Sequence, residues 1–326
     1  MVNQSQTSNS QMNPLRYRIL ITGGAGFIGT HLGRICQNLG HSVTSLDLVP
    51  PAPERRSDEV DFVQGDVRDE AQIQWALDQN YDAIFFLAAI SSVPHCDAEP
   101  HLAYETNTLA PLRWLERLRN HSRDTRFIFS STSAVYGHSG SEHQALSEAS
   151  PLQPLSHYAY QKWITETALT QAAIHAKLPY YCFRLFNVYG PYQDPKSPYS
   201  GVISKFIDLA TQKKPLILFG DGHQTRDFVH VQDVVKGLLS VLKLKTPLQH
   251  PINLGSGSSI SIKQLATLIQ DLCEVPHEQE NHAERPNDVR HSVSSIEFLK
   301  KTLGITPEVR LEQGLKELIQ SSRNAL

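Results

Sequence analysis

Short apolar runs alternate with longer stretches of helical periodicity along most of this chain. Helices are predicted at 98–119 and 158–176, and the apolar runs start at residue 18 and recur at 42–48, 60–63, 83–89, 126–129 and 180–185. Strands that alternate with helices in this way build right-handed βαβ units around a parallel sheet. The pattern therefore predicts an α/β fold, with a doubly wound parallel sheet and a smaller α/β lobe towards the C-terminus.

The helix predicted at 158–176 has one apolar side. Apolar residues recur at helical spacing along it, and a side of this kind is expected to pack on the sheet. These residues are Trp163, Ile164, Ala168, Leu169 and Ala172.

The first apolar run breaks at RILITGGAGFIG, residues 18–29, where three of the glycines, Gly23, Gly26 and Gly29, follow at three-residue spacing. Gly23 allows a turn that requires positive φ, Gly26 lets backbone approach a phosphate, and Gly29 lets the next helix lie close to the sheet. A strand, a tight turn and a helix start in this order present N–H groups and a helix dipole to a pyrophosphate. The stretch therefore predicts a dinucleotide-binding turn.

Asp47 ends the second apolar run, roughly twenty residues beyond the glycines, where a carboxylate accepts hydrogen bonds from an adenosine ribose. The carboxylate would repel a 2′-phosphate, so this position favours NAD over NADP as the cofactor.

The chain changes character after Asn187. The change is marked by polar loops at 190–201 and 220–226, a strand-like run at 251–254 and a helix at 262–273. We expect a Rossmann nucleotide-binding domain over 16–186, with segments near 228–255 returning to it, and a second lobe made mainly of 187–326. Residues 1–15 are rich in Gln, Ser and Asn and are expected to form a disordered tail.

The composition excludes several classes of partner. The formal net charge is −3 and the 30 basic residues are scattered, so we expect no nucleic-acid or membrane partner. The four cysteines form no CxxC pair, which is typical of reduced thiols in a cytoplasmic protein. The fifteen histidines form no HExxH pattern, and we expect no metal.

Tyr158 and Lys162 lie four residues apart on a predicted helix, so their side chains share a face. A nearby ammonium stabilises a phenolate, and this spacing therefore predicts a lowered pKa for the Tyr158 hydroxyl and a role as a base. A row of hydroxyl residues, 130–133, ends the fifth predicted strand and would bring a partner hydroxyl to the tyrosine.

Taken together, these motifs resemble an extended short-chain dehydrogenase/reductase of the NAD-dependent sugar epimerase/dehydratase family. The resemblance covers residues 17 to about 315 and rests on TGGAGFIG, GDVRD, FLAA, SSTSAVYG, YAYQK, RLFNVYGP, FGDG followed by TRDFVHV, NLGSG and ERPNDVRHS. It implies that Thr132 is the catalytic hydroxyl residue and that Lys162 holds the nicotinamide ribose. The implied cofactor contacts are Gly23, Gly26, Phe27, Ile28, Gly29, Asp47, Asp66, Val67, Leu87, Ala88, Asn107, Tyr158 and Lys162.

The resemblance also implies a nucleotide-sugar substrate, held mainly by the second lobe. Asn187, Arg226 and Arg285 fall where the family contacts the diphosphate, and Asp288 falls where the family ties down a uridine ribose or the phosphate-binding arginine. A homodimer formed by helices near 98–119 and 158–176 is implied as well.

The motifs indicate a family and leave several reactions open within it. In nucleotide-sugar 4,6-dehydratases, the segment that begins with the catalytic hydroxyl residue resembles TDEVYG. The corresponding segment of this chain, residues 132–137, is TSAVYG and lacks both carboxyl groups. No clear residue set for a C6 carboxylate is visible. This leaves 4-epimerisation of a UDP-hexose or UDP-N-acetylhexosamine as the preferred reaction. A dehydratase, a decarboxylase, a uronate epimerase and an NAD(P)-dependent sugar reductase stay open as alternatives.

Two further positions concern the choice of substrate and the rigidity of the site. Ser292 falls where hexose 4-epimerases gate the space beside C2 with a bulky tyrosine, so its small side chain predicts that N-acetyl groups are admitted. His157 stands where the family most often has proline, which predicts a less rigid entry to the catalytic helix.

Overall fold

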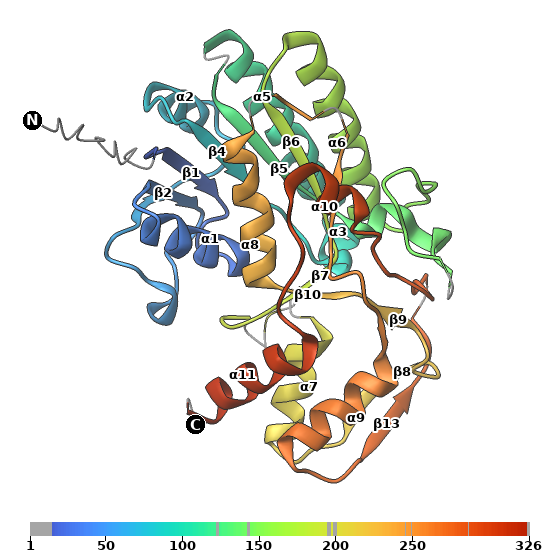
Figure 1. Cartoon of the computed structure of the whole chain (residues 1–326). Coiled ribbons are helices and arrows are strands. Elements are labelled where there is room, and N and C mark those ends of the chain that lie inside the picture. The colour runs from blue at the N-terminus through green and yellow to red at the C-terminus, as the bar shows by residue number, and fades with distance from the viewer. Residues whose placement is uncertain are drawn as a thin grey trace, which may run out of the picture.

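The computed structural model of the chain describes residues 15–121, 124–141, 144–193, 197, 201–244, 246–248, 250–285 and 287–324. Apart from residue 15, the predicted tail at 1–15 lies outside these residues. Figure 1 shows a larger lobe built around one sheet and a smaller lobe below it, which contains the C-terminal helix.

The central sheet of the larger lobe has seven strands, all parallel to their neighbours. In sheet order the strands are β11 (Ile252–Leu254), β6 (Tyr180–Leu185), β5 (Arg126–Thr132), β4 (Ala83–Phe86), β1 (Arg18–Thr22), β2 (Ser42–Asp47) and β3 (Asp61–Gln64). The order reverses direction at β1 and β4, so loops on both sides of this point open towards the same edge. The predicted doubly wound parallel sheet is confirmed.

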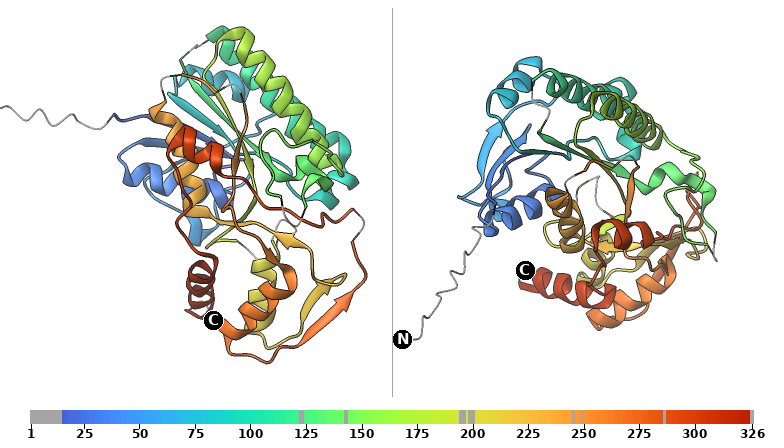
Figure 2. Two further views of the ribbon diagram at one scale, coloured as in Figure 1. Left: turned by 45° about the vertical axis from the view of Figure 1, so that its right-hand side comes forward. Right: turned by 45° about the horizontal axis from the view of Figure 1, so that its top comes forward.

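Helices cover both faces of this sheet (Figures 1 and 2). One face packs against α1 (Phe27–Asn38), α8 (Val231–Ser240) and α10 (Glu297–Leu303). The other packs against α2 (Glu70–Asp78), α5 (Ala110–His121) and α6 (His157–Ala176). Because both faces are covered, the central strands are apolar on both sides, and all four residues of β4 are buried.

The smaller lobe has its own apolar core. Three helices form it, α7 (Val202–Thr211), α9 (Ile262–Cys273) and α11 (Leu311–Asn324). Three strand pairs accompany them: β7 (Asn187–Tyr189) with β10 (Phe228–His230), β9 (Thr225–Arg226) with β12 (Ile260–Ser261), and β8 (Leu216–Phe219) with β13 (Gln279–His282).

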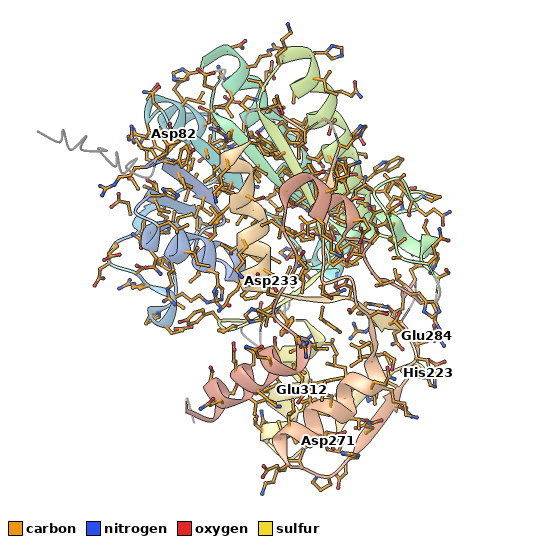
Figure 3. All side chains as sticks on the ribbon, in the orientation of Figure 1. Asp82, His223, Asp233, Asp271, Glu284 and Glu312 are labelled. Carbon is orange, nitrogen blue, oxygen red and sulfur yellow. The ribbon has the colours of Figure 1, made fainter. Side chains whose placement is uncertain are left out.

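A buried carboxylate fixes the approach to α11. Asp233 on α8 accepts hydrogen bonds from the backbone N–H groups of Glu308 and Val309, at 3.1 and 2.9 Å. Figure 3 labels Asp233 where α8 meets the smaller lobe. Among the described residues, no helix is long and apolar enough to cross a membrane.

The helix predicted at 98–119 is divided in the structure. It consists of α3 (Val93–Ala98), α4 (Pro100–Tyr104), a π-helical turn η2 (Glu105–Leu109) and α5. Glu99 has φ −125° and ψ 61°, which is not helical, because the ring of Pro100 disfavours the α conformation in the residue before it.

The predicted apolar side of α6 was partly wrong. Ile164 is 41% exposed, whereas the buried face of the helix carries Gln161, Lys162 and Glu166 beside Leu169. Polar groups can occupy a buried helix face when each finds a partner, and this face is the one that carries the candidate chemistry.

Candidate active site

The glycine turn between β1 and α1 requires glycine at two of its three positions. Gly23 has φ +70°, and a Cβ there would lie 2.8 Å from the backbone nitrogen of Ala88. A Cβ on Gly29 would lie 2.4 Å from the carbonyl oxygen of Gly23. Both distances are too short for any other residue, so the turn can press against the sheet and α1 only with glycine present.

Gly26 faces the open side of this turn. A Cβ there would have only the carbonyl oxygen of Gly23 within 4 Å, at 3.1 Å. Gly26 caps α1 without a side-chain hydrogen bond, so the N–H groups of the first turn, from Phe27, Ile28 and Gly29, lie at an uncapped helix start. These features fit a dinucleotide pyrophosphate, which needs close backbone approach and free N–H donors.

Asp47 ends β2 directly beside this turn. One carboxylate oxygen accepts a hydrogen bond from the N–H of Ala25 at 3.1 Å, and the other accepts one from Leu48 at 2.8 Å. Burial raises the pKa of Asp47, against the effect of these bonds. The carboxylate is therefore anchored at the edge where an adenosine ribose is expected.

Four further predicted cofactor residues lie at the ends of β3 and β4. Asp66 accepts two bonds at 3.0 Å from Nε of Arg68, and this guanidinium lowers the pKa of the Asp66 carboxyl. The carbonyl of Val67 accepts a bond from the Trp114 indole at 2.8 Å. Leu87 and Ala88 donate their N–H groups to the carbonyl and hydroxyl oxygens of Thr22, at 3.1 and 3.3 Å.

Asn107 is fully enclosed in the π-helical turn. Its amide oxygen accepts from the N–H of Ile90 at 2.8 Å, and its amide nitrogen donates to the carbonyl of Ile90 at 3.0 Å and to Gln161 at 2.7 Å. Asn107 therefore fixes the loop that follows β4 to α6. Its predicted contact with the cofactor stays a prediction.

Thr132 and Tyr158 come together at the carboxyl edge of the sheet. Thr132 is the last residue of β5, and Tyr158 is the second residue of α6, whose N-terminus is capped by the Ser156 hydroxyl. The Thr132 side chain lies beside the Tyr158 hydroxyl and lowers its pKa as a hydrogen-bonding partner. Two hydroxyl groups in contact can pass a proton between them.

The predicted lowering of the Tyr158 pKa was wrong for the protein without cofactor. Burial raises the pKa of Tyr158 to about 12, although the hydrogen bond with Thr132 acts in the opposite direction. Desolvation penalises the phenolate more than one hydrogen bond stabilises it.

Lys162, one turn beyond Tyr158 on α6, is buried and only 2% exposed. Its ammonium donates to the carbonyl of Ser130 at 2.9 Å and lies 4.6 Å from the centre of the Phe129 ring. Burial lowers the pKa of Lys162 to about 8, so its charge is weakly held.

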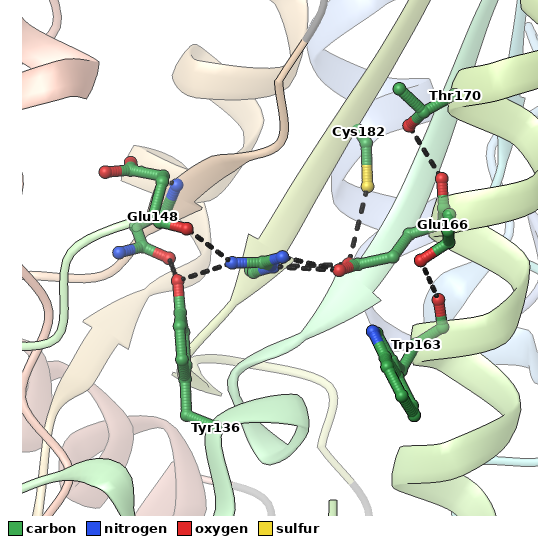
Figure 4. A network of polar contacts seen from close by, with 9 residues as sticks. Tyr136, Glu148, Trp163, Glu166, Thr170 and Cys182 are labelled. Carbon is green, nitrogen blue, oxygen red and sulfur yellow. Dashed lines mark hydrogen bonds and ion pairs between the residues drawn. The ribbon is translucent and has the colours of Figure 1, made fainter. Parts of the chain in front are cut away.

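A buried ion pair joins the same helix to the sheet, one turn beyond Lys162. Arg184 of β6 donates to the Glu166 carboxylate at 2.6 Å, and both side chains are less than 5% exposed. The guanidinium also donates to the Tyr136 hydroxyl at 2.9 Å, and that hydroxyl donates to Asn253 at 2.7 Å (Figure 4). This network ties α6, β6 and the segment after Thr132 into one unit.

The predicted substrate residues of the second lobe fall into one connected group. Arg226 on β9 donates to a carboxylate oxygen of Asp288 and to the carbonyl of Val289, both at 2.5 Å. The sequence predicts that Asp288 ties down a phosphate-binding arginine, and the pair has this arrangement. Asn187 donates its side-chain amide and its backbone N–H to the carbonyl of Asp227, at 3.2 and 3.1 Å.

The two remaining predicted substrate residues of this lobe differ in exposure. Arg285 is exposed, and its guanidinium carbon lies 3.9 Å from the centre of the Phe219 ring. Ser292 is 6% exposed, in a segment that runs beside Leu146 through backbone bonds of Val293 and Ser295.

Asp227 was missed by the sequence reasoning. Its side chain is fully buried, and it accepts bonds from the N–H and hydroxyl groups of both Ser256 and Ser294 and from the N–H of Gly257, at 2.6–3.1 Å. Its carbonyl accepts from Asn187, so this one residue joins the strand of Arg226 to the segment of Ser292. The one sequence feature that could have indicated this role is the position of Asp227 between Arg226 and an apolar run.

Other chemistries find no support in the described part of the chain. No group of three or more His, Cys, Asp or Glu side chains there could hold a metal ion. The four cysteines are buried and form no disulfide. His157, the first residue of α6, is exposed to solvent.

Known proteins are similar to most of this chain. The family model described as NAD dependent epimerase/dehydratase family matches residues 19–255. A putative UDP-glucose 4-epimerase of Methanocaldococcus jannaschii is 31% identical over 309 residues, 94% of this chain and 98% of that protein.

Solved structures are similar over the whole fold. The UDP-glucose 4-epimerase of Thermotoga maritima, solved with UDP-glucose, gives a TM-score of 0.88 at 31% identity and covers 94% of this chain and 99% of that one. The UDP-N-acetylglucosamine 4-epimerase of Methanobrevibacter ruminantium, solved with UDP-N-acetylmuramic acid, gives 0.87 at 31% identity, covering 95% and 99%.

Relatives with other reactions are equally similar. The human dTDP-D-glucose 4,6-dehydratase is 31% identical over 93% of this chain and 89% of that protein. Similarity therefore shows the family and its NAD cofactor, and leaves the substrate and the reaction to be argued from the residues of the site.

We expect Glu166→Gln to destabilise the protein by about 3 kcal/mol, because it leaves the Arg184 guanidinium buried without its counter-charge. Urea unfolding measures this loss. Glu70→Gln is the matched control, since it breaks an ion pair with Arg117 whose side chains are 52% and 50% exposed, and about 1 kcal/mol or less is expected. Equal losses in the two variants would contradict the role of the buried pair.

The depressed pKa of Lys162 predicts a pH-dependent stability. Below pH 8 the folded protein without cofactor bears a buried charge, and above pH 10.5, the ordinary value, the amine is neutral in both states. Relative to Lys162→Met, the free energy of unfolding of the wild type should rise by about 3 kcal/mol across this window. Denaturant unfolding of cofactor-stripped proteins at several pH values checks it, and a difference independent of pH would contradict the assignment.

Proposed function

The chain belongs to the NAD-dependent epimerase/dehydratase family, and we propose that within it the protein is a 4-epimerase of a UDP-hexose or UDP-N-acetylhexosamine. NAD is the family's cofactor, and the glycine turn fits its pyrophosphate. The observation that carries the proposal is the Thr132–Tyr158 hydroxyl pair with no carboxyl group in the segment beside it.

Elimination of water needs an acid and a base besides the tyrosine. The segment that follows Thr132, η3 (Ser133–Ser139), contains no aspartate or glutamate, and Tyr136 within it is committed to Arg184 and Asn253. A site with one proton-transfer pair supports oxidation and reduction at a single carbon. This favours epimerisation over dehydration.

The side chains of the site have different roles in this reaction. Tyr158, as phenolate, takes the proton of the sugar 4-hydroxyl, directly or through Thr132, and returns it after the 4-keto sugar has turned about its diphosphate link. When bound, NAD supplies the hydride acceptor and donor at C4 and, in its oxidised form, a positive charge that favours the phenolate. A pKa of about 12 without this charge keeps Tyr158 protonated until the cofactor is in place.

The second lobe supplies the diphosphate clamp of this proposal. Arg226 is held rigidly by Asp288 and the carbonyl of Val289, while Arg285 stacks on Phe219 at the surface. A guanidinium offers forked donors that suit phosphate oxygens. Asn187, on the strand pair β7–β10, adds a side-chain amide.

We also propose that the protein is a cytoplasmic homodimer. Leu109, Tyr160 and Ile164 are each at least 40% exposed on η2 and α6, which supports a paired face formed by these helices. The buried cysteines, which form no disulfide, support a reducing compartment.

Proton NMR tests the reaction. UDP-N-acetylglucosamine and UDP-glucose, incubated separately with the purified protein and no added cofactor, should each give a second anomeric signal that grows to a fixed ratio. Tyr158→Phe should lower turnover by about 10²–10⁴-fold while NAD stays bound, because only the proton acceptor is removed.

The same spectra identify the alternatives. Loss of the substrate signal to a 4-keto-6-deoxy product would replace epimerisation by dehydration, and conversion of UDP-glucuronic acid, incubated separately, to a pentose product would replace it by decarboxylation. Turnover only with stoichiometric reduced cofactor would indicate a reductase. Near-normal activity of Tyr158→Phe would remove the tyrosine from the mechanism.

Ser292 is proposed to admit the N-acetyl group at C2. Ser292→Tyr should lower kcat/KM for UDP-N-acetylglucosamine by about tenfold or more and leave UDP-glucose turnover within a few-fold, because a bulky ring excludes only the larger substituent. Ser292→Ala is the matched control and should retain both activities. An unchanged ratio of the two substrates in Ser292→Tyr would contradict the gate.

A further inference from the structure

A cavity of about 280 Å³ lies between α1, the edge of the sheet and the connection from β2 to β3. Within this connection, residues 48–60, the only helical element is the single turn η1 (Pro53–Arg55). Figure 1 shows this loop beside α1, where other connections carry a full helix. The cavity therefore occupies space that the layer of helices leaves open.

Two buried polar atoms in the cavity lining have no hydrogen-bond partner among the described residues. They are the hydroxyl of Ser45, a side chain 4% exposed, and Nε of Arg55. A buried donor without a partner is destabilising, and most such groups in folded proteins are paired with protein, water or ligand. Both groups are hydrogen-bond donors, and an anionic oxygen is a suitable partner for either of them.

Positive charge dominates the cavity. Arg34, Arg55 and Arg56 line it together with one carboxylate, that of Asp58. Arg34 donates to the carbonyls of Glu54 and Arg56, at 2.9 and 3.2 Å, and so holds the loop over the cavity. Guanidinium groups around a partly enclosed space favour a doubly charged anion.

The floor of the cavity is apolar. Ile21, Val60 and Phe62 contribute to it, and Gly33 of α1 forms part of the wall. A Cβ on Gly33 would meet Val60 at 3.5 Å and Ile21 at 3.8 Å, which are ordinary contacts. Packing does not require glycine here, and the space is wide enough for a carbon skeleton behind an anionic group.

The cavity adjoins the dinucleotide site. Gly24 of the glycine turn lines it, and Arg55 donates to the carbonyl of Ala25 at 3.4 Å, while the N–H of Ala25 donates to Asp47. We propose that this cavity binds a phosphate monoester beside the adenosine end of the cofactor. The proposal rests on NAD lying along the glycine turn and is independent of the 4-epimerase reaction.

Two sources share this chemistry. The phosphate monoester belongs either to a dinucleotide with a 2′-phosphate or to a separate small molecule that enters while NAD is bound. Asp47 opposes the first source by like charge, and the arginines favour it.

Calorimetric titration separates the sources. NADP⁺ is titrated into cofactor-stripped protein, and glycerol 3-phosphate is titrated into NAD-loaded protein, with glycerol as the uncharged control. At least one phosphorylated probe should bind, and Ser45→Ala and Arg55→Met should each weaken that binding about tenfold or more. Arg310→Met, an exposed arginine of the other lobe, should bind as the wild type does.

Ser45→Ala keeps the test independent of folding. The hydroxyl has no partner in the protein, so its removal should leave the melting temperature without probe unchanged or higher, whereas Arg55→Met also removes a contact to the glycine turn. Binding of neither probe at millimolar concentration, or binding unaffected by Ser45→Ala, would overturn the proposal.

Discussion

The buried carboxylate of Asp227 is the constraint on which the substrate half of the structure depends. A buried carboxylate that forms no ion pair with any described residue must be stabilised by hydrogen bonds, and here two serines and a glycine from two distant segments provide them. Separating these segments would leave the buried Asp227 carboxylate without its hydrogen-bond donors. The loop after β11, the strand of Arg226 and the segment of Ser292 are therefore fixed relative to one another before any ligand arrives.

The catalytic half depends on a comparable use of buried charge. On α6, Tyr158, Lys162 and Glu166 follow one another at single-turn spacing, and each meets a different partner: Thr132, the carbonyl of Ser130, and Arg184. Because Arg184 also holds Tyr136, the helix with the tyrosine cannot shift without moving the segment that follows Thr132. The proton-transfer pair is thus positioned by groups that do not take part in the chemistry.

The sequence was most informative where a residue type has one physical reason to be present. The alternation of strands and helices predicted the sheet, and the glycines at 23 and 29 predicted the tight turn that leads into α1. It was least informative where the outcome depends on burial. The polar buried face of α6 and the raised pKa of Tyr158 follow from what packs around them, and Asp227 became visible only when Ser256 and Ser294 were placed beside it.

The order in which the chain visits its two lobes has a consequence for folding. After β6 the chain builds α7 and β8 of the smaller lobe, and only later adds α8, β11 and α10 to the larger one, so that Ile252 pairs with Phe183 and Leu299 completes the core against α1's face. Such contacts between distant residues carry a high loop-closure cost and form late. During synthesis on the ribosome, the part of this apolar face that α8 and α10 cover therefore stays exposed beside α1 until nearly the whole chain has emerged. Neither lobe can be released as an independent folding unit by cutting the chain once between them.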